Sequence, residues 1–572
     1  MDASVCKTGG WRVNMMKTGN DHKKRNSPGG MEEEKAGRLM YAALFILLCL
    51  QVLLLVYFGS RKAGFHEDEY YSYYSTNRTA GLYEPDREWM ERDVFRNEFV
   101  ALPGEGFRYG LVSMVQSWDV HPPLFYFILH TACSFFPGIF SKWLGIGINI
   151  IAFCVNFVLL AWLTFMITGR NRKLTFAVAA VHGWNGIIIS GVMFIRMYEW
   201  LTVFVLLCSC LHVKAMAEKD RGVKKFLLPL MAVNFCGFLT QYYYILFLFF
   251  MGFGFCLWEL LWERKWVNCI KYGVACGFSL LLAVISYPAS LSHIFRGYRG
   301  TGAASEFLNA GNTVDRFRFF AGLMNDYLFD GYLWFWLLLI AVMLCLARAG
   351  NRKAGGEEKI PCRHIEAAPY FLLLFTASGY FFTVSKTALL LYETSNRYQL
   401  PVYGIALLLV MAALYELWGR AVYLLAPGAD GKKEKYRKIG AVIVFAAFLL
   451  GDIHGLVSGK VIFLYEEDRE YVEYAKENWN MPVVVLYNDA TPYHVWWCSQ
   501  ELMQYERVYF ASQGNQGRIT DETVCGSGKL IVYAADYSTQ EESLARILES
   551  NPGLKGYRLA ARRGLWSVFE FE

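Results

Sequence analysis

Charged residues are scarce in this chain. Only 19% of its 572 residues are Asp, Glu, Lys or Arg, whereas 55% are hydrophobic and 17% are aromatic. Soluble domains carry about 25% charged residues. A helix needs about 20 mostly apolar residues to cross a bilayer, and such runs occur from about residue 39 to residue 457. The composition therefore excludes a soluble multi-domain protein and predicts a polytopic α-helical membrane protein.

Several motifs are missing as well. The chain has no Cys-x-x-Cys pair and no two histidines four residues apart, so a protein-built metal site has little support from the sequence. We find no internal repeat, and the C-terminal part has no glycine-rich phosphate loop. The sequence thus assigns no metal ligand and no cofactor, and it leaves a divalent metal ion open.

Most of the 14 cysteines lie inside apolar runs. A thiol packs there as a small hydrophobic group. Only Cys498 and Cys525 fall in the polar C-terminal part, where they are either two free thiols or one disulfide. A disulfide scaffold is not predicted.

The basic residues predict the orientation of the spans, because cytoplasmic loops are enriched in Lys and Arg. All five basic loops face one side only if the short segment 121–138 does not cross the membrane completely. The chain then has about eleven spans, and the net charge of +6 indicates topology rather than nucleic-acid binding. The five loops are 169–173, 214–225, 263–265, 348–359 and 431–438.

This map divides the chain into three parts. Residues 1–38 are polar and lack the pattern of a cleavable signal peptide, which predicts a cytoplasmic tail. Residues 39–458 are predicted to form the transmembrane domain with a first outer loop at 60–142, in which 84–99 has the pattern of an amphipathic surface helix. Residues 459–572 alternate helix and strand patterns and predict an extracytoplasmic α/β domain, to which we assign acceptor binding or a lid function.

The densest group of carboxylates follows the first span, in GFHEDEYYSYYSTN at 64–77. Asp68 and Glu69 are adjacent, and neighbours on a helix point about 100° apart, so only one of them can face a given cavity. Glu67 is expected to be solvated. In the simpler alternative, the acids are interfacial and the tyrosines form an aromatic belt.

A second polar group is found in SWDVHPPLFYFILH at 117–130. Asp119 and His121 precede a proline pair that can begin a helix without backbone donors. They are predicted to line the rim of a cavity, or else to flank a capped interfacial helix.

Arginines occur at the outer ends of two further spans. Arg196 and Glu199 are three residues apart in FIRMYEW, which makes them a self-neutralising pair on one helix face or leaves Arg196 to bind an anion. Arg397 and Tyr398 begin a span in SNRYQLP, where a lipid phosphate could bind. His293, Arg296 and Arg299 form another basic cluster.

The order of these motifs resembles a known family. An Asp-Glu after the first span in EDEYYSYY, then DVHPPL at 119–124, then IRMY at 195–198, resembles the GT-C membrane glycosyltransferases of the protein O-mannosyltransferase and aminoarabinose transferase kind (glycosyltransferase family 39). The resemblance covers about residues 39–420. It implies transfer of a sugar from a polyprenyl-phosphate donor to a protein, lipid or glycan acceptor at the outer face of the plasma membrane.

The resemblance also implies roles for individual residues. Asp68 matches the position of the base, with Glu69 as a neighbouring acceptor contact, and a direct displacement would invert the anomeric carbon. A transporter or flippase of lipid-linked or anionic substrates is the alternative, and a non-catalytic protein whose outer domain binds a partner is the third hypothesis. The candidate substrate-binding residues are Asp119, His121, Arg196, Glu199, Arg397 and Tyr398.

Overall fold

The computed structural model describes residues 28–77, 89–218, 222–353, 365–425, 430–512, 514, 516, 519 and 528–572. Residues 1–27 of the predicted tail, the beginning of the predicted surface helix at 84–88, and Cys525 lie outside the described residues. Cys498 is a buried free thiol.

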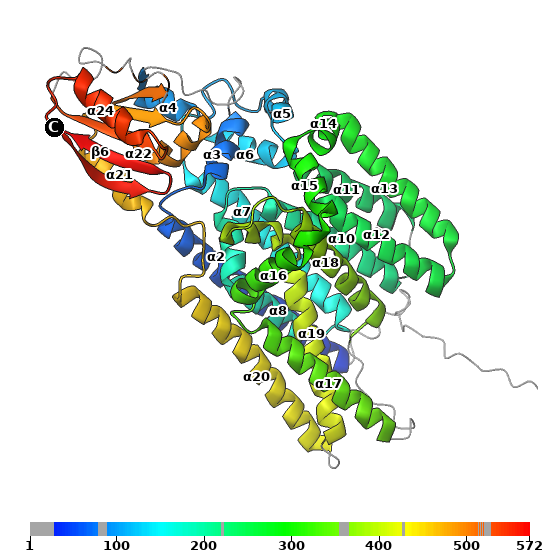
Figure 1. Cartoon of the computed structure of the whole chain (residues 1–572). Helices are drawn as coiled ribbons and strands as arrows, with labels where there is room; N and C mark the ends of the chain where they lie inside the picture. The colour runs from blue at the N-terminus through cyan, green and yellow to red at the C-terminus, as the bar shows by residue number, and fades with distance from the viewer. Residues whose placement is uncertain are drawn as a thin grey trace, which may run out of the picture.

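Long apolar helices make up most of the described chain (Figure 1). Nine of them are long and apolar enough to cross a membrane, or up to eleven spans if each of two bent pairs counts as one. The long helices are α2 (Pro28–Arg61), α7 (Lys142–Ile167), α10 (Tyr198–Glu218), α11 (Leu228–Thr240, preceded by the π-helical turn η1, Val223–Leu227), α12 (Tyr244–Trp258, followed by the π-helical turn η2, Glu259–Glu263), α13 (Trp266–Ser286), α18 (Ala367–Thr387), α19 (Leu400–Leu425) and α20 (Asp430–Val457).

The two bent pairs have local causes. Helix α8 (Arg172–Trp184) ends before Asn185, whose side chain accepts a hydrogen bond from the backbone of Ile187 and so caps α9 (Gly186–Met193); the two helices meet at 57°. The second pair bends by 93° near Asp330, which has a positive φ of 50°. It consists of η3 (Ala310–Asn312), α16 (Thr313–Leu323), η4 (Met324–Leu328) and α17 (Leu333–Lys353).

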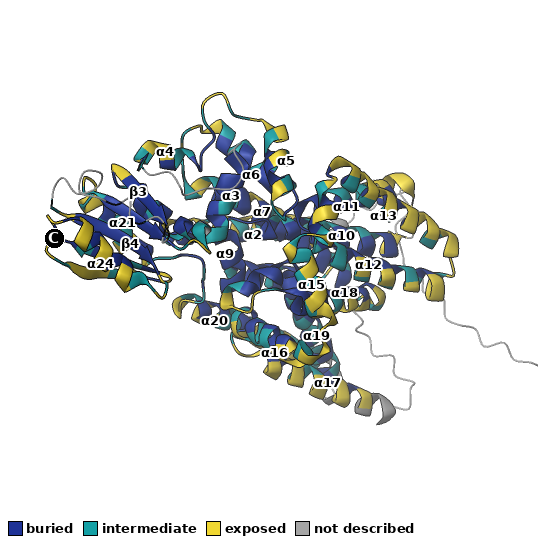
Figure 2. Ribbon diagram, turned by 45° about the horizontal axis from the view of Figure 1, so that its top comes forward, coloured by how far each residue is buried: buried dark blue, intermediate teal, exposed yellow. Residues whose placement is uncertain are grey.

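The outward faces of the peripheral helices are apolar. On α13, Ile270, Val274 and Ile285 are more than half exposed, and Figure 2 shows α13 and α17 largely yellow while α3 and α9 are mostly dark blue. Exposed apolar faces along whole helices suit contact with lipid rather than water. The chain is an integral membrane protein, as its composition predicts.

Short helices connect the spans on the side of the C-terminal domain (Figure 1). The segment expected not to cross completely contains α6, an apolar helix of only 12 residues. These short elements are α3 (Glu67–Asn77), α4 (Arg92–Asn97), α5 (Tyr109–Trp118), α6 (Leu124–Phe135), α14 (Ala289–Phe295), α15 (Tyr298–Leu308) and the 3-10 turn η5 (Glu393–Tyr398).

The C-terminal part is an α/β domain built on a six-stranded sheet of order β1-β3-β2-β4-β6-β5. Strands β2, β3 and β4 are parallel and almost completely buried, and β5 and β6 form an antiparallel hairpin at the end of the chain. Its elements are α21 (Asp468–Glu477), β2 (Val483–Tyr487), η6 (Pro492–Cys498), α22 (Ser499–Leu502), β3 (Arg507–Ser512), β4 (Leu530–Ala535), α24 (Gln540–Ser550), β5 (Tyr557–Arg563) and β6 (Trp566–Phe571).

The sixth strand comes from the loop at 60–142 that follows the first span. Strand β1 (Trp89–Glu91) pairs antiparallel with β3, and Phe95 of α4 is buried with its ring 6.0 Å from that of Phe510. Residues 89–97 are therefore a strand and a short helix packed on the domain, not the amphipathic surface helix that their pattern predicted. Apolar residues at helical spacing fit both structures, and the sheet edge decides between them.

Candidate functional site

The acidic segment after the first span folds as helix α3. Glu67, Asp68 and Glu69 all lie in its first turn, where the helix dipole stabilises negative charge. The backbone amide of Asp68 donates to Nδ1 of His66 at 3.1 Å, so His66 caps the helix. The three carboxylates point to three different environments, and only Asp68 meets the arginines.

Asp68 lies against Arg397, which η5 supplies from more than 300 residues away in the chain. Arg397 Nη2 is 3.4 Å from Asp68 Oδ2, and the Arg397 side chain is 2% exposed. The guanidinium is also held over the rings of Phe194 and Tyr398 at 5.5 and 5.0 Å. Such stacking fixes the plane of the guanidinium and leaves its edge to bind an anion.

Arg196 approaches the same helix from the turn between α9 and α10. Its Nη1 donates to the carbonyl oxygen of Asp68 at 3.1 Å and to the hydroxyls of Ser72 and Tyr126 at 3.2 Å. Its Nη2 lies 2.8 Å from Nε2 of His121. Arg196 therefore ties together α3, α6 and the DVHPPL segment.

His121 is buried beside this guanidinium. Burial and the charge of Arg196 hold the pKa of His121 well below its ordinary value, so the neutral imidazole accepts the hydrogen bond from Arg196. His66 is neutral too, because burial lowers its pKa to about 4. The distance of 3.8 Å between His66 Nδ1 and Asp68 Oδ2 is thus not an ion pair at neutral pH.

Two opposing effects set the pKa of Asp68. Burial raises it, but Arg196 and Arg397 together with smaller contributions from His66 and Arg299 lower it well below the ordinary value. Arg299 belongs to α15 and is half-buried. For Asp119, burial outweighs Arg196 and raises the pKa. The result is a site in which the buried guanidinium groups of Arg196 and Arg397 lie beside an ionised Asp68, with Arg299 and Asp119 near them.

The guanidinium groups have unused donors. Nε of Arg196 and Nε of Arg397 are buried and have no hydrogen-bond acceptor among the described residues. A buried charged donor without a partner is costly. Both atoms would be satisfied by an anion entering the site.

Glu69 has a different environment from Asp68. Its carboxylate accepts from Lys62 Nζ at 2.9 Å, from the amide of His66 at 2.6 Å and from the amide of Ile195 at 2.8 Å, and both charged side chains are fully buried. With these donors occupied, Glu69 fixes the residues that precede Asp68 and Arg196. Its geometry favours a positioning role over the acceptor contact predicted for it.

Glu199 and Tyr398 also have definite places. The helix α10 begins only at Tyr198, so Arg196 and Glu199 do not share a helix face, and Glu199 instead accepts from Asn156 Nδ2 at 3.0 Å. Tyr398 is 4% exposed, and its hydroxyl accepts from Arg397 Nη2 at 3.4 Å. The structure brings Asp68, His121, Arg196, Arg397 and Tyr398 together and directs Glu199 elsewhere.

The C-terminal domain covers the remaining carboxylate. Trp497 of η6 donates from Nε1 to Glu67 Oε2 at 2.9 Å, and its ring lies 5.5 Å from that of His66. Trp496 packs on Tyr71 at 4.0 Å. The prediction that Glu67 is solvated is therefore wrong. Burial raises the pKa of Glu67 to about 8. The local sequence around Glu67 could not indicate this contact, because Trp497 lies more than 400 residues away in the chain.

The raised pKa of Glu67 predicts a pH-dependent penalty on folding. Its pKa rises from 4.5 to about 8 on folding, so the folded state holds a proton that the unfolded state releases, and stability is lost as the pH rises from about 5 through 8. Glu67→Gln removes this loss. We expect the free energy of unfolding of Glu67→Gln to exceed that of wild type by roughly 1–3 kcal/mol at pH 9 and to equal it near pH 4.

The measurement is thermal unfolding of the full chain in detergent from pH 4 to 9. Glu506→Gln serves as the control, since Glu506 is an exposed carboxylate of the C-terminal domain that covers Glu67. If the stabilities of wild type and Glu67→Gln change with pH in parallel, the Glu67 carboxyl is not buried in the folded state.

No three His, Cys, Asp or Glu side chains converge on a metal-binding point within the described part of the chain.

Comparison with known proteins gives one likeness. No protein-family model matches the chain, and no curated protein matches it. The fold is similar to that in the crystal structure of ArnT from Cupriavidus metallidurans bound to undecaprenyl phosphate, with 10% sequence identity and a TM-score of 0.49 over 92% of this chain and 97% of that chain.

Proposed function

We propose that this protein is a membrane glycosyltransferase that moves a sugar from a polyprenyl-phosphate donor to a hydroxyl acceptor at the outer membrane face. The observation that carries the proposal is the buried cluster in which Arg196 and Arg397 flank the ionised Asp68. Two buried guanidinium groups with free Nε donors, close to the ends of apolar helices, suit a phosphate attached to a lipid.

The reaction needs few groups. The acceptor oxygen forms a bond to the anomeric carbon while the bond from that carbon to the phosphate oxygen breaks, and polyprenyl phosphate leaves as the anion. Arg196 and Arg397 stabilise the charge that develops on the phosphate, and Asp68 takes the acceptor proton. This is a single direct displacement, so it inverts the anomeric carbon.

The geometry also links donor binding to the strength of the base. The arginines that lower the pKa of Asp68 are those proposed to bind the phosphate. A bound phosphate offsets their charge, and the pKa of Asp68 then rises toward its ordinary value. Asp68 becomes a stronger base only when the donor is in place, which disfavours proton abstraction in the empty site.

The flippase alternative predicts a different location for the charged residues. A transporter of this kind places charged groups within interrupted helices near the middle of the membrane. The chain has two bent helix pairs, but Asp68, Arg196 and Arg397 lie in short elements outside the candidate spans. Their location favours chemistry at one face.

The deciding experiment supplies purified protein in proteoliposomes with polyprenyl-phosphate sugars that carry a radiolabel in the sugar. A transferase releases the label from the lipid into an acceptor fraction, whereas a flippase leaves it on the lipid and changes only its side of the membrane. Label that stays on every donor, with membrane extracts supplied as acceptor, would refute the transferase.

Arg397→Gln is expected to weaken donor binding about 10- to 100-fold, because a charge-assisted bond to phosphate contributes about 1.5–3 kcal/mol. It also removes a charge that lowers the pKa of Asp68, so activity should be lost at a higher pH as the solution is acidified. Donor affinity and the pH profile of kcat/KM measure the two effects. Arg296→Gln is the control, since Arg296 is an exposed arginine of the nearby α14–α15 turn; equal losses in both variants would contradict the assignment.

A further inference from the structure

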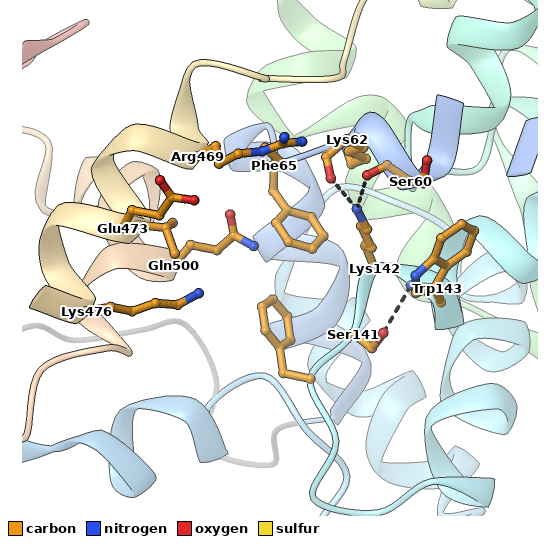
Figure 3. A pocket seen from close by; sticks show the side chains of 13 residues that line it. Ser60, Lys62, Phe65, Ser141, Lys142, Trp143, Arg469, Glu473, Lys476 and Gln500 are labelled. Atoms are coloured by element: carbon orange, nitrogen blue, oxygen red, sulfur yellow. Dashed lines mark hydrogen bonds between the residues drawn. The ribbon is translucent and has the colours of Figure 1, made fainter. Parts of the chain in front are cut away.

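A second positively charged site lies at the junction of the C-terminal domain and the helices. A cavity of about 420 Å³ opens there between α21 on one side and the outer ends of α2 and α7 on the other (Figure 3). Lys142, Arg469 and Lys476 line it, against Glu473 as a lining carboxylate. The candidate active site contains none of these residues.

One face of α21 forms the domain wall of the cavity. Arg469, Val472, Glu473 and Lys476 follow each other at spacings of three, one and three residues, so they share one helix face. Figure 3 shows Arg469, Glu473 and Lys476 on this helix, facing Lys142 and Trp143. The described residues offer Arg469 and Lys476 no ion-pair partner.

The opposite wall holds Lys142 in place. Its Nζ donates to the backbone carbonyls of Ser60, at 3.3 Å, and of Lys62. An ammonium group has three donors, so one is left for a ligand. The neighbouring Lys62 contributes no net charge, because it is paired with Glu69 at 2.9 Å.

The surroundings indicate where the ligand comes from. Lys142 and Trp143 begin the span α7, and Trp143 is 40% exposed. Tryptophan and basic side chains at a span end are typical of the headgroup level of a bilayer. The cavity therefore opens where lipid phosphates lie.

We propose that this cavity binds the phosphate of an anionic membrane lipid, held by Lys142, Arg469 and Lys476. Three cationic groups converge on it from two domains, and Glu473 leaves an excess of positive charge. A bound phosphate would join α21 to the ends of α2 and α7 and so fix the C-terminal domain over α3. The site goes beyond the proposed function and stands whether or not the chain transfers a sugar.

The test measures lipid binding to the full chain in detergent by native mass spectrometry. The probes are dihexanoyl phosphatidylglycerol, dihexanoyl phosphatidylcholine and inorganic phosphate. Arg469→Gln/Lys476→Gln removes two cavity charges, and Arg546→Gln/Lys555→Gln removes two exposed charges of the same domain outside the cavity.

We expect the cavity variant to bind phosphatidylglycerol about tenfold or more weakly than wild type, with the control variant unchanged and phosphatidylcholine bound equally by all three. Competition by inorganic phosphate would show that the phosphate group alone is recognised, and its absence would assign the site to the intact lipid. Equal affinities in the cavity variant and wild type, or an equal loss in the control, would overturn the site.

Discussion

Asp68→Asn is expected to lower the transfer rate about 10²- to 10⁴-fold, the usual effect of removing a positioned base. Asparagine keeps the size of the side chain but cannot accept the proton from the acceptor hydroxyl. The carbonyl oxygen of Asp68, which receives the bond from Arg196, is retained. The loss should therefore fall on kcat rather than on the folding of the site.

Donor binding separates this role from a purely structural one. Asp68 carries the negative charge nearest to Arg397, and removing it leaves the arginines more attractive to phosphate. The affinity of Asp68→Asn for a non-hydrolysable donor analogue should equal or exceed that of wild type. Asp93→Asn, at an exposed carboxylate of the same outer loop, is the control. Normal turnover by Asp68→Asn would remove Asp68 as the base.

The spans and the C-terminal sheet could be predicted because their signals are local. Apolar runs mark the long helices, and the strands β2, β3 and β4 appear as apolar runs between turn residues. Strand β1 could not be predicted in this way, since its three residues pair with β3 only when the C-terminal domain packs beside the loop that follows the first span. The hydropathy pattern of such a short edge strand is the same as that of part of a helix.

The sequence predicted some features of the candidate site and missed others, for the same reason. The residue types at Asp68, His121, Arg196 and Arg397 suggested an anion site, and the structure places them together although they lie in four separate segments. Sequence spacing failed for Arg196 and Glu199, because the helix begins after Arg196. It also missed the neutral His66 and the contact between Glu67 and Trp497, which depend on tertiary burial.

Lys62→Met is expected to destabilise the protein by about 3–5 kcal/mol, the usual cost of removing one partner from a buried ion pair. Burial raises the pKa of Glu69 and lowers that of Lys62, so neither charge is stable there alone. Methionine fills a similar volume but leaves the Glu69 carboxylate uncompensated. Because Glu69 also receives the amides of His66 and Ile195, the loss should disturb the residues that carry both Asp68 and Arg196.

A double-mutant cycle tests the coupling in the full chain in detergent. Glu69→Gln removes the charge that Lys62→Met leaves exposed to the apolar interior, so the double variant should lose less stability than the sum of the two single losses. Lys555→Met, at an exposed lysine, should unfold like wild type. Additive losses would mean that Lys62 and Glu69 stabilise the fold independently, and Glu69 would then hold the segments that carry Asp68 and Arg196 without needing its buried partner.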